Sequence, residues 1–240
     1  MTTTESGTAA DIDQFVEQVK DDAVFAFHAL REIGTRSANG TVSIVERIPG
    51  HRKFVFISAP DPLRRQTTAV AHVGDLGENS PILQAFGGVL NEHEDITTVI
   101  HVHSPYLGAW AQSHRPLPIR YAASQRLTLA REIPSYIDRT QTQVDFILER
   151  LKEDPHTPAI LEANGGATVW GREGLLKTVE FIVVLEEGAQ FQLLAEALGG
   201  AQEFGPGVLA QQWQMTGLLT AARDEGRLPV TRPKGPEVDE

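Results

Sequence analysis

The feature that most constrains the fold is a series of short runs rich in β-branched and apolar residues, separated by turn residues and by longer helical patterns. Runs of this composition are typical of β-strands. Pro49 and Gly50 separate the first two runs, which predicts antiparallel neighbours. The expected strands are TVSIVE (41–46), KFVFIS (53–58), TTAVAHV (67–73), TTVIHVH (97–103), PAILEA (158–163) and GATVWG (166–171).

Helical patterns surround these runs. Apolar side chains recur every three or four residues over 12–30, which predicts an amphipathic helix. Ser80 and Ser104 each precede a proline, as a capping residue does at a helix start. Further helices are expected at 81–93, from 105 onward, and at 141–152, 173–198 and 208–224, with a loop-rich segment at 115–136. The pattern predicts an α/β fold, a single domain with a central, mainly antiparallel sheet flanked by helices.

The length and the two ends of the chain indicate one domain. A chain of 240 residues is long enough to bury a sizeable core. The polar ends at 1–10 and 228–240 are expected to be flexible tails around a domain at 11–227. No apolar run approaches the roughly 20 residues that cross a bilayer, and the first residues lack the features of a secretory signal. We therefore expect a soluble, cytoplasmic protein that does not enter a membrane.

Charge and cysteine content restrict the chemistry. The formal net charge of −11 argues against a nucleic-acid partner, because binding to phosphates requires a basic face. The chain has no cysteine, which excludes disulfides, thiolate metal ligands and a cysteine nucleophile. Any metal site must therefore consist of histidine and carboxylate side chains, and eight histidines are present.

The strongest chemical signal is His101-Val102-His103 at the end of an apolar strand. Residues i and i+2 of a strand point to the same face, so both imidazoles are expected to project together. Two neighbouring imidazoles provide part of a divalent metal site. The alternative is a pair of polar residues that is merely hydrogen-bonded at a strand end. Sites gather at the carboxyl ends of strands, which favours the metal interpretation.

The other histidines and the glycine-bearing turns carry weaker signals. We interpret the remaining histidines as surface or core residues: His28, His51, His72, His93, His114 and His156. Asn164-Gly165-Gly166 lies between two expected strands and predicts a tight turn. The stretch GTRSANG (34–40) offers backbone amides to an anion, but it lacks the spacing of a known phosphate loop.

Taken in order, several segments resemble the class II aldolase/adducin family from the first helix to Leu198. The matching segments are GTRSANGTVS for a GT-x-GN-x-S loop, HVHSPYLGAWAQSHRPLPIRY for an HxH strand, helix and proline loop, AILEANGGATVWG for a strand, NHG turn and strand, and FIVVLEEGAQFQLLAEALGG for a long helix with an E-x-x-A-Q pattern. The resemblance implies an α/β/α domain and a homotetramer with active sites between subunits. It also implies a divalent metal that stabilises an enediolate during C–C cleavage or epimerisation.

Carried over by position, the family's catalytic residues match only in part. His101 and His103 match the first two metal-binding histidines. The remaining positions differ: the third histidine falls on Gly165, the acid/base on Ile82, a neighbouring histidine on Phe86, the phosphate-loop asparagine on Thr41, and the paired serines on Ser80 and Pro81. Isoleucine cannot move a proton beside a polarised carbonyl, so no catalytic acid/base is assigned.

These substitutions favour a different substrate. The expected pocket has fewer anion donors and more apolar side chains than that of the family, which favours a substrate with an aromatic or prenyl group over a sugar phosphate. The candidate substrate-binding residues are Thr41, Ser80, Ile82, Phe86, Tyr136 and Gly165.

Glu162 has the opposite strand parity to residue 165, which places it on the other face of the sheet. Arg120, Arg126 and Arg131 are candidates for holding a substrate carboxylate, and solvation is the alternative for each. Four aromatic residues near the site segments are compatible with an aromatic substrate, and packing in the core is the alternative for each: Tyr106, Trp110, Tyr121 and Tyr136.

Three functions remain open. Two histidines with several open coordination positions suit iron(II) over zinc or manganese, and this favours oxidative cleavage with dioxygen. One branch of the family fits this description: the non-heme iron oxygenases of aminocoumarin antibiotic biosynthesis, which oxidatively decarboxylate a prenylated hydroxyphenylpyruvate. The second function is a conventional aldolase or epimerase acting as a lyase on a small hydroxy-carbonyl compound. The third is a non-catalytic, adducin-like scaffold.

Overall fold

The computed structural model describes residues 9–38, 40–61, 65 and 68–229. The two expected tails therefore lie almost entirely outside the described residues. Helix α1 (Ala9–Glu32) begins slightly before the expected domain boundary at residue 11. Within the described part of the chain, no helix combines the length and the apolar character needed to cross a membrane.

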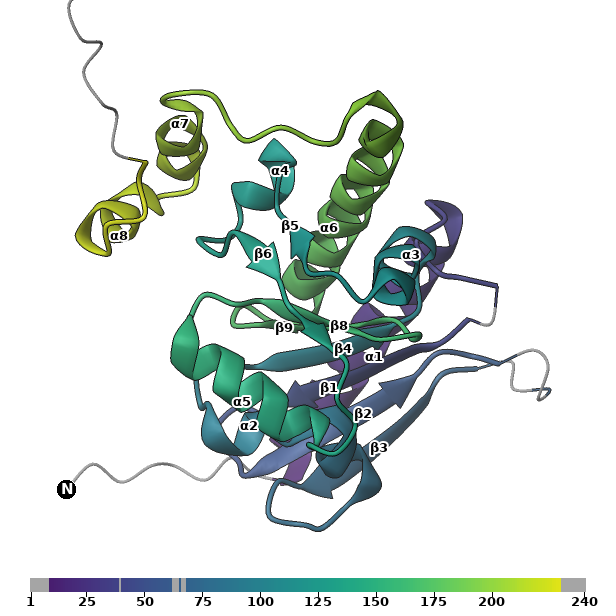
Figure 1. The fold of residues 1–240 in the computed structure, drawn as a ribbon. Helices are drawn as coiled ribbons and strands as arrows, with labels where there is room; N and C mark the ends of the chain where they lie inside the picture. The colour runs from purple at the N-terminus through teal and green to yellow at the C-terminus, as the bar shows by residue number, and fades with distance from the viewer. Residues whose placement is uncertain (1–8, 39, 62–64, 66–67, 230–240) are drawn as a thin grey trace, which may run out of the picture.

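The expected strands form one twisted sheet at the centre of the molecule (Figure 1). Its spatial order is β3-β2-β1-β4-β9-β8-β7. The bounds are β1 (Val42–Arg47), β2 (Lys53–Ser58), β3 (Val70–Asp75), β4 (Thr98–Val102), β7 (Ser135–Tyr136), β8 (Ala159–Glu162) and β9 (Ala167–Gly171). All neighbouring pairs are antiparallel except β7 and β8, which are parallel. The prediction of a central, mainly antiparallel sheet is therefore confirmed, including the antiparallel pair around Pro49 and Gly50.

Helices cover both faces of this sheet. One core cluster joins the sheet to α1, α3 (Pro105–Ser113) and α6 (Leu175–Ala195), and fully buried Ile44 and Ile100 lie within it. The second cluster joins the opposite face to a π-helical turn (Leu83–Gly87), α2 (Val89–Glu92) and α5 (Gln143–Glu153). Adjacent strand residues belong to opposite clusters because successive side chains alternate across a sheet. The result is an α/β/α domain.

Several short elements depart from the expected pattern. The segment expected as loop contains β5 (Leu117–Pro118), β6 (Glu132–Ile133) and α4 (Ala122–Gln125), besides β7. These elements have only two to four residues, too few for a periodic pattern to appear in the sequence. The helix expected at 81–93 contains the π-helical turn and then α2, because Gly87 and Gly88 interrupt the α-helical pattern. The long helix expected at 173–198 corresponds to α6 and a 3₁₀ turn at Glu196–Leu198.

The last expected helix is two helices, α7 (Val208–Met215) and α8 (Leu219–Asp224). Gly217 adopts φ 77 between them and ends the first helix. In Figure 1 these helices stand apart from the sheet, beside α4 and β6. Trp213 of α7 is fully buried, and its indole N–H donates to the carbonyl oxygens of Gln125 and Thr128.

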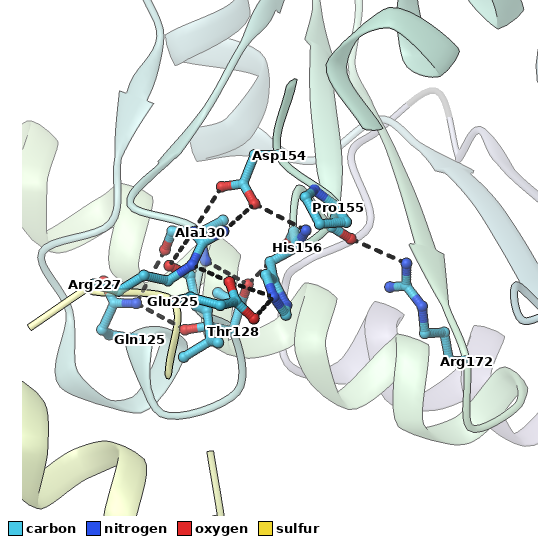
Figure 2. A network of polar contacts seen from close by, with 10 residues as sticks. Gln125, Thr128, Ala130, Asp154, Pro155, His156, Arg172, Glu225 and Arg227 are labelled. Carbon is cyan, nitrogen blue, oxygen red and sulfur yellow. Dashed lines mark hydrogen bonds and ion pairs between the residues drawn. The ribbon is translucent and has the colours of Figure 1, made fainter. Parts of the chain in front are cut away.

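A polar network attaches the end of α8 to the main domain (Figure 2). Arg227 donates to both carboxylate oxygens of Asp154 at 2.8 and 3.0 Å. His156 Nε2 lies 2.9 Å from Oε1 of Glu225. Burial acts to raise the pKa of Asp154, but the hydrogen bond from Arg227 and a second from the backbone of His156 outweigh it and lower the pKa. The C-terminal helices are thus attached by charged contacts as well as by Trp213.

Candidate functional site

The two histidines of the HxH motif lie together at the end of the central strand. β4 lies between β1 and β9, and His101 is opposite Ser43 on one side and Thr168 on the other. His103 follows the strand, and its backbone N–H donates to the carbonyl oxygen of Thr41 at 3.0 Å. The ring centroids of His101 and His103 are 5.0 Å apart in an edge-to-face arrangement. The shared face expected from the i, i+2 spacing is therefore present.

Glu186 positions the helix that follows this pair. Its carboxylate accepts hydrogen bonds from the backbone N–H groups of Tyr106 and Leu107, both at 2.8 Å, in the first turn of α3. Ser104 was expected to cap this helix, but its hydroxyl group donates to Glu186 instead. A negative charge satisfies unpaired N–H groups and the helix dipole at this terminus. Burial raises the pKa of Glu186, although these three hydrogen bonds oppose the shift.

A buried polar cluster surrounds one edge of the His101 ring. Oε1 of Glu162 lies 2.8 Å from Nδ1 of His101. The same oxygen accepts hydrogen bonds from the Thr168 hydroxyl at 2.6 Å and from the Gln143 amide at 3.0 Å. The Gln143 amide also donates to the Thr168 hydroxyl at 2.8 Å. Side chains from β4, β8, β9 and the first residue of α5 thus meet in one cluster.

The expectation that Glu162 lies on the other face of the sheet is wrong. Strand parity applies only within a strand, and β8 ends at Glu162. Asn164 adopts φ 60 in the following turn, which interrupts the alternation before residue 165. Counted along β8 itself, Glu162 shares the α5-facing side with buried Ile160.

Burial and neighbouring groups shift the pKa values of two groups here. Burial acts to raise the pKa of Glu162, but the contact with His101 and the hydrogen bond from Thr168 outweigh it and lower the pKa. The carboxylate is therefore ionised near neutral pH. Burial and the nearby His101 lower the pKa of His103, although Glu162 opposes this shift. A lowered pKa favours the neutral imidazole, the form that binds metals.

The side of the cluster facing the π-helical turn is apolar. The ring of Phe86 stacks on that of His101 with centroids 5.9 Å apart. Ile82 is partly buried and packs with Phe86 against the second core cluster. Ser80 accepts a hydrogen bond of 3.3 Å from the backbone N–H of Leu83, so its hydroxyl group caps this turn as expected. The ring of Phe86 therefore places hydrocarbon next to His101.

The glycine turn lies against the HxH motif. A Cβ atom at Gly166 would lie 2.1 Å from the carbonyl oxygen of Val102 and 2.7 Å from Cδ2 of His103. The backbone N–H of Gly165 donates to the carbonyl oxygen of Glu162 at 2.8 Å, which closes the turn. Among the described residues, no three His, Asp or Glu side chains are grouped as a complete metal-ligand set.

Tyr136 and three of the arginines have other partners. Tyr136 is buried, and its hydroxyl group donates to the carbonyl oxygen of Gln141. Arg120 and Arg131 form ion pairs with Glu203. Arg126 donates to the side chain of Gln212 at 3.0 Å in α7. Each of these three arginines therefore contacts the C-terminal segment.

Two residues near the site were missed in the sequence. Gln143 joins the Glu162 cluster directly. Arg139 donates to the carbonyl oxygen of Ala163 at 3.1 Å, and its guanidinium lies 4.6 Å from the ring centroid of Tyr136. Both residues lie in or beside a loop, where the sequence shows no periodic pattern. The only signal for Gln143 in the sequence is that it is a polar residue near the start of an expected helix.

Two further features, His114 and a cavity near the end of β9, lie outside the cluster around His101. His114 contacts Asn164 at 2.7 Å on the outer side of the glycine turn. A cavity of about 480 Å³ lies at the opposite end of β9, lined by Gly171, Arg172, Phe181 and Leu218 among others. Since β9 runs from beside Val102 to beside Thr98, this cavity is separate from the histidine pair.

A single α/β/α domain with a central, mainly antiparallel sheet and a histidine pair at the end of its middle strand defines an aldolase-like protein. The sequence matches the model of the class II aldolase and adducin N-terminal domain over residues 66–193, which is more than half of the chain. The chain therefore belongs to the class II aldolase and adducin family. No curated protein matches it.

Solved structures of aldolases share the fold. An L-fuculose 1-phosphate aldolase is 15% identical, with a TM-score of 0.63 over 90% of this chain and 100% of the other. The L-fuculose 1-phosphate aldolase from Glaciozyma antarctica PI12 is 17% identical, with a TM-score of 0.65 over 92% of each chain. YgbL from Escherichia coli, a putative aldolase/epimerase/decarboxylase, is 16% identical, with a TM-score of 0.59 over 83% of this chain and 99% of the other. These likenesses confirm the fold.

Proposed function

We propose that this protein is a metal-dependent enzyme that breaks a C–C bond next to a carbonyl group in a small, non-phosphorylated oxo- or hydroxy-acid. The observation that carries the proposal is the pair His101 and His103, 5.0 Å apart between ring centroids. The Nδ1 atom of His101 contacts a buried carboxylate, as metal-binding histidines commonly do. The presence of both imidazoles, together with the polar cluster around His101, favours an enzyme over an adducin-like scaffold.

The residues present fit a divalent metal held by two imidazoles. With Nδ1 of His101 against Glu162, its Nε2 remains as the metal-binding atom, and His103 provides the second donor. A bound metal would supply Lewis-acid polarisation of the substrate carbonyl. Gly165 provides no side chain where the family has a third histidine, so substrate and water would complete the coordination. Several open positions favour iron(II) over zinc or manganese.

The surroundings of His101 favour an aromatic substrate. Phe86 and Ile82 provide an apolar wall, where an aromatic or prenylated body would pack. Thr41 borders the pair through its backbone carbonyl group, and Gly165 lies in the turn whose next residue, Gly166, packs against His103. Arg139, next to the end of β8, is well placed to bind a substrate carboxylate. Tyr136 acts through this arginine, since the guanidinium lies over its ring.

We favour oxidative decarboxylation with iron(II) and dioxygen, in the manner of the aminocoumarin-biosynthesis oxygenases. A lyase would need a side chain that moves protons beside the carbonyl, and Ile82 stands where the family has that acid. Glu162 is already engaged by three donors. The second candidate is a lyase or epimerase, favoured by the aldolase names of the structural neighbours.

We also propose that the enzyme is a homotetramer. Phe191, Leu194 and Leu198 near the end of α6 are 47%, 60% and 89% exposed, respectively. Exposed apolar side chains that gather along one helix are typical of a subunit interface. Light scattering after gel filtration measures the mass directly, and a monomer at micromolar concentration would contradict this assembly.

The experiment that tests the function has two stages. Protein purified without chelators is analysed for bound iron, zinc and manganese, and then reloaded with each metal. Oxygen consumption is followed with iron(II) and an arylpyruvate such as 4-hydroxyphenylpyruvate. We expect iron-dependent oxygen uptake that His101→Ala abolishes and that His28→Ala, on the exposed face of α1, retains. Substrate turnover under anaerobic conditions would instead support the lyase, and a failure to bind any metal would refute both.

A further inference from the structure

We infer that Glu162 is a positioning residue that fixes His101 in the tautomer with the proton on Nδ1, so that Nε2 is the metal-binding atom. The inference rests on the proposed function for its purpose, but the tautomer itself is a property of the metal-free protein. The observation that carries it is the contact of 2.8 Å between Oε1 of Glu162 and Nδ1 of His101. Both side chains are largely buried, with 10% and 16% of their surfaces exposed.

The hydrogens of the cluster can be counted. As a carboxylate, Glu162 accepts hydrogen bonds and donates none. The single hydroxyl proton of Thr168 is donated to Oε1 of Glu162 at 2.6 Å. The two amide protons of Gln143 are directed to Oε1 of Glu162 and to Oγ1 of Thr168. Nδ1 of His101 contacts Oε1 of Glu162 and Oγ1 of Thr168, and neither oxygen has a proton to donate to it. Nδ1 must therefore carry the proton, and the neutral ring has its lone pair on Nε2.

The same count argues that Glu162 supports a ligand rather than binding the metal itself. Its Oε1 atom already accepts from His101, Thr168 and Gln143. Binding a metal through this oxygen would break buried hydrogen bonds, and each unsatisfied donor costs about 1–3 kcal/mol. A carboxylate on the outer nitrogen of a metal-bound imidazole orients the ring and raises its basicity.

The elements that hold Glu162 are rigid. It ends β8, with the backbone N–H of Glu162 donating to the carbonyl oxygen of Gly166 at 2.9 Å. Thr168 lies in β9, directly opposite His101 in the ladder. Gln143 is the first residue of α5, whose N-terminus is capped by Thr142. Cluster and imidazole are therefore held by backbone pairing, and the ring orientation does not depend on a loop.

Long-range ¹⁵N NMR of the metal-free protein at pH 8 tests the tautomer, because an ordinary imidazole is neutral at this pH. The His101 signals are assigned by their loss in His101→Ala. We expect a pyrrole-like Nδ1 and a pyridine-like Nε2 for His101 in the wild type. In Glu162→Gln we expect this pattern to be lost, since an amide can donate to Nδ1. A pyridine-like Nδ1 in the wild type, or an unchanged pattern in Glu162→Gln, would overturn the inference.

Glu186→Gln is the matched control. Glu186 is also a buried carboxylate with three hydrogen-bond donors, but no imidazole is among them. The Glu186→Gln protein should be less stable than the wild type and should keep the His101 tautomer. If Glu162→Gln does not fold, Thr168→Val provides the second variant: it removes one donor to Glu162, and the Nδ1 proton of His101 should remain. Loss of that proton in Thr168→Val would contradict the proton count.

Titration with cobalt(II) connects the tautomer to metal binding. We expect Glu162→Gln to bind cobalt(II) about 10–100-fold more weakly than the wild type. If the wild type shows the expected tautomer but binds no metal, the proposed function fails and the tautomer assignment stands. If the wild type binds metal and Glu162→Gln binds it equally well, the positioning role fails and the proposed function stands.

Discussion

Oε2 of Glu186, in the middle of α6, accepts a hydrogen bond of 2.8 Å from Oγ of Ser104, the residue before α3. The two oxygens of this carboxylate also accept from two backbone N–H groups of α3. Helix α6 therefore supplies the cap of the helix that begins two residues after His103. Through this contact the long helix fixes the end of the histidine-bearing segment.

Replacing Glu186 by alanine should destabilise the protein by about 3 kcal/mol, because three donors lose their acceptor in a buried site. Ser104→Ala should cost only about 1 kcal/mol, since the two backbone hydrogen bonds to Glu186 remain. Urea unfolding monitored by circular dichroism gives both free energies. Equal losses in the two variants would contradict the capping role of the carboxylate.

Gly166→Ala should unfold or strongly destabilise the protein, by about 3 kcal/mol or more. Its Cβ atom would lie 2.1 Å from a backbone oxygen of β4, which cannot move away as a flexible side chain could. Gly77→Ala is the control, because no atom lies within 4 Å of the added Cβ there. The melting temperatures of the two variants test this, and a stable Gly166→Ala protein would contradict the close approach of the turn to Val102.

Gly165→His should restore a third imidazole to the site. A Cβ atom at Gly165 would lie 3.3 Å from the carbonyl oxygen of Glu162, so a side chain fits after a small shift. A third protein ligand should raise zinc affinity by about tenfold or more. Competition with a chromogenic chelator measures the affinity, and Gly165→Ala controls for the added Cβ. An unchanged affinity would show that residue 165 does not face the metal.

Glu46 should make stability depend on pH. Burial, followed by the nearby charge of Asp22, raises its pKa from 4.5 to about 8, although a hydrogen bond to Thr98 opposes the shift. Its Oε2 atom is buried and has no hydrogen-bond partner among the described residues. Its folded-state pKa is raised, so the stabilisation is complete below about pH 4.5 and is lost as the pH rises to about 8.

Glu46→Gln keeps the shape of the neutral side chain and removes the titration. The wild type should lose stability relative to this variant between pH 5 and pH 8, by up to on the order of 4 kcal/mol. Urea unfolding of both proteins at the two pH values provides the comparison. Other titrating groups contribute equally to both proteins and cancel. A constant difference between the proteins would show that Glu46 is ionised at pH 5.

Patterns within single elements were read correctly because their physical causes are local. Runs rich in β-branched and apolar residues predicted β1, β2, β3, β4, β8 and β9, and the i, i+2 spacing of His101 and His103 predicted their shared face. Turn chemistry predicted the glycine turn after β8. Helix α4 could not be predicted, because it is held by contacts with α6 and α7 rather than by its own sequence.

The surroundings of His101 depended on contacts between distant segments. Glu162 lies 61 residues after His101 in the chain. Its sheet face was predicted wrongly because strand alternation was extended beyond Glu162, where β8 ends. Gln143 begins α5 and Arg139 lies in the turn before it, where no periodic pattern exists. Nothing in the sequence near Glu186 or Ser104 indicates that one caps the helix of the other.

The sequence by itself determined most of the strands and helices and the position of one histidine pair, since each follows from the composition or the period of a single strand or helix. Only the tertiary structure decided which groups surround that pair. Strand order places Thr168 opposite His101, and the end of β8 turns Glu162 onto the same face. The physical reason is that alternation specifies a face within one strand, whereas partners on that face are chosen by pairing between strands.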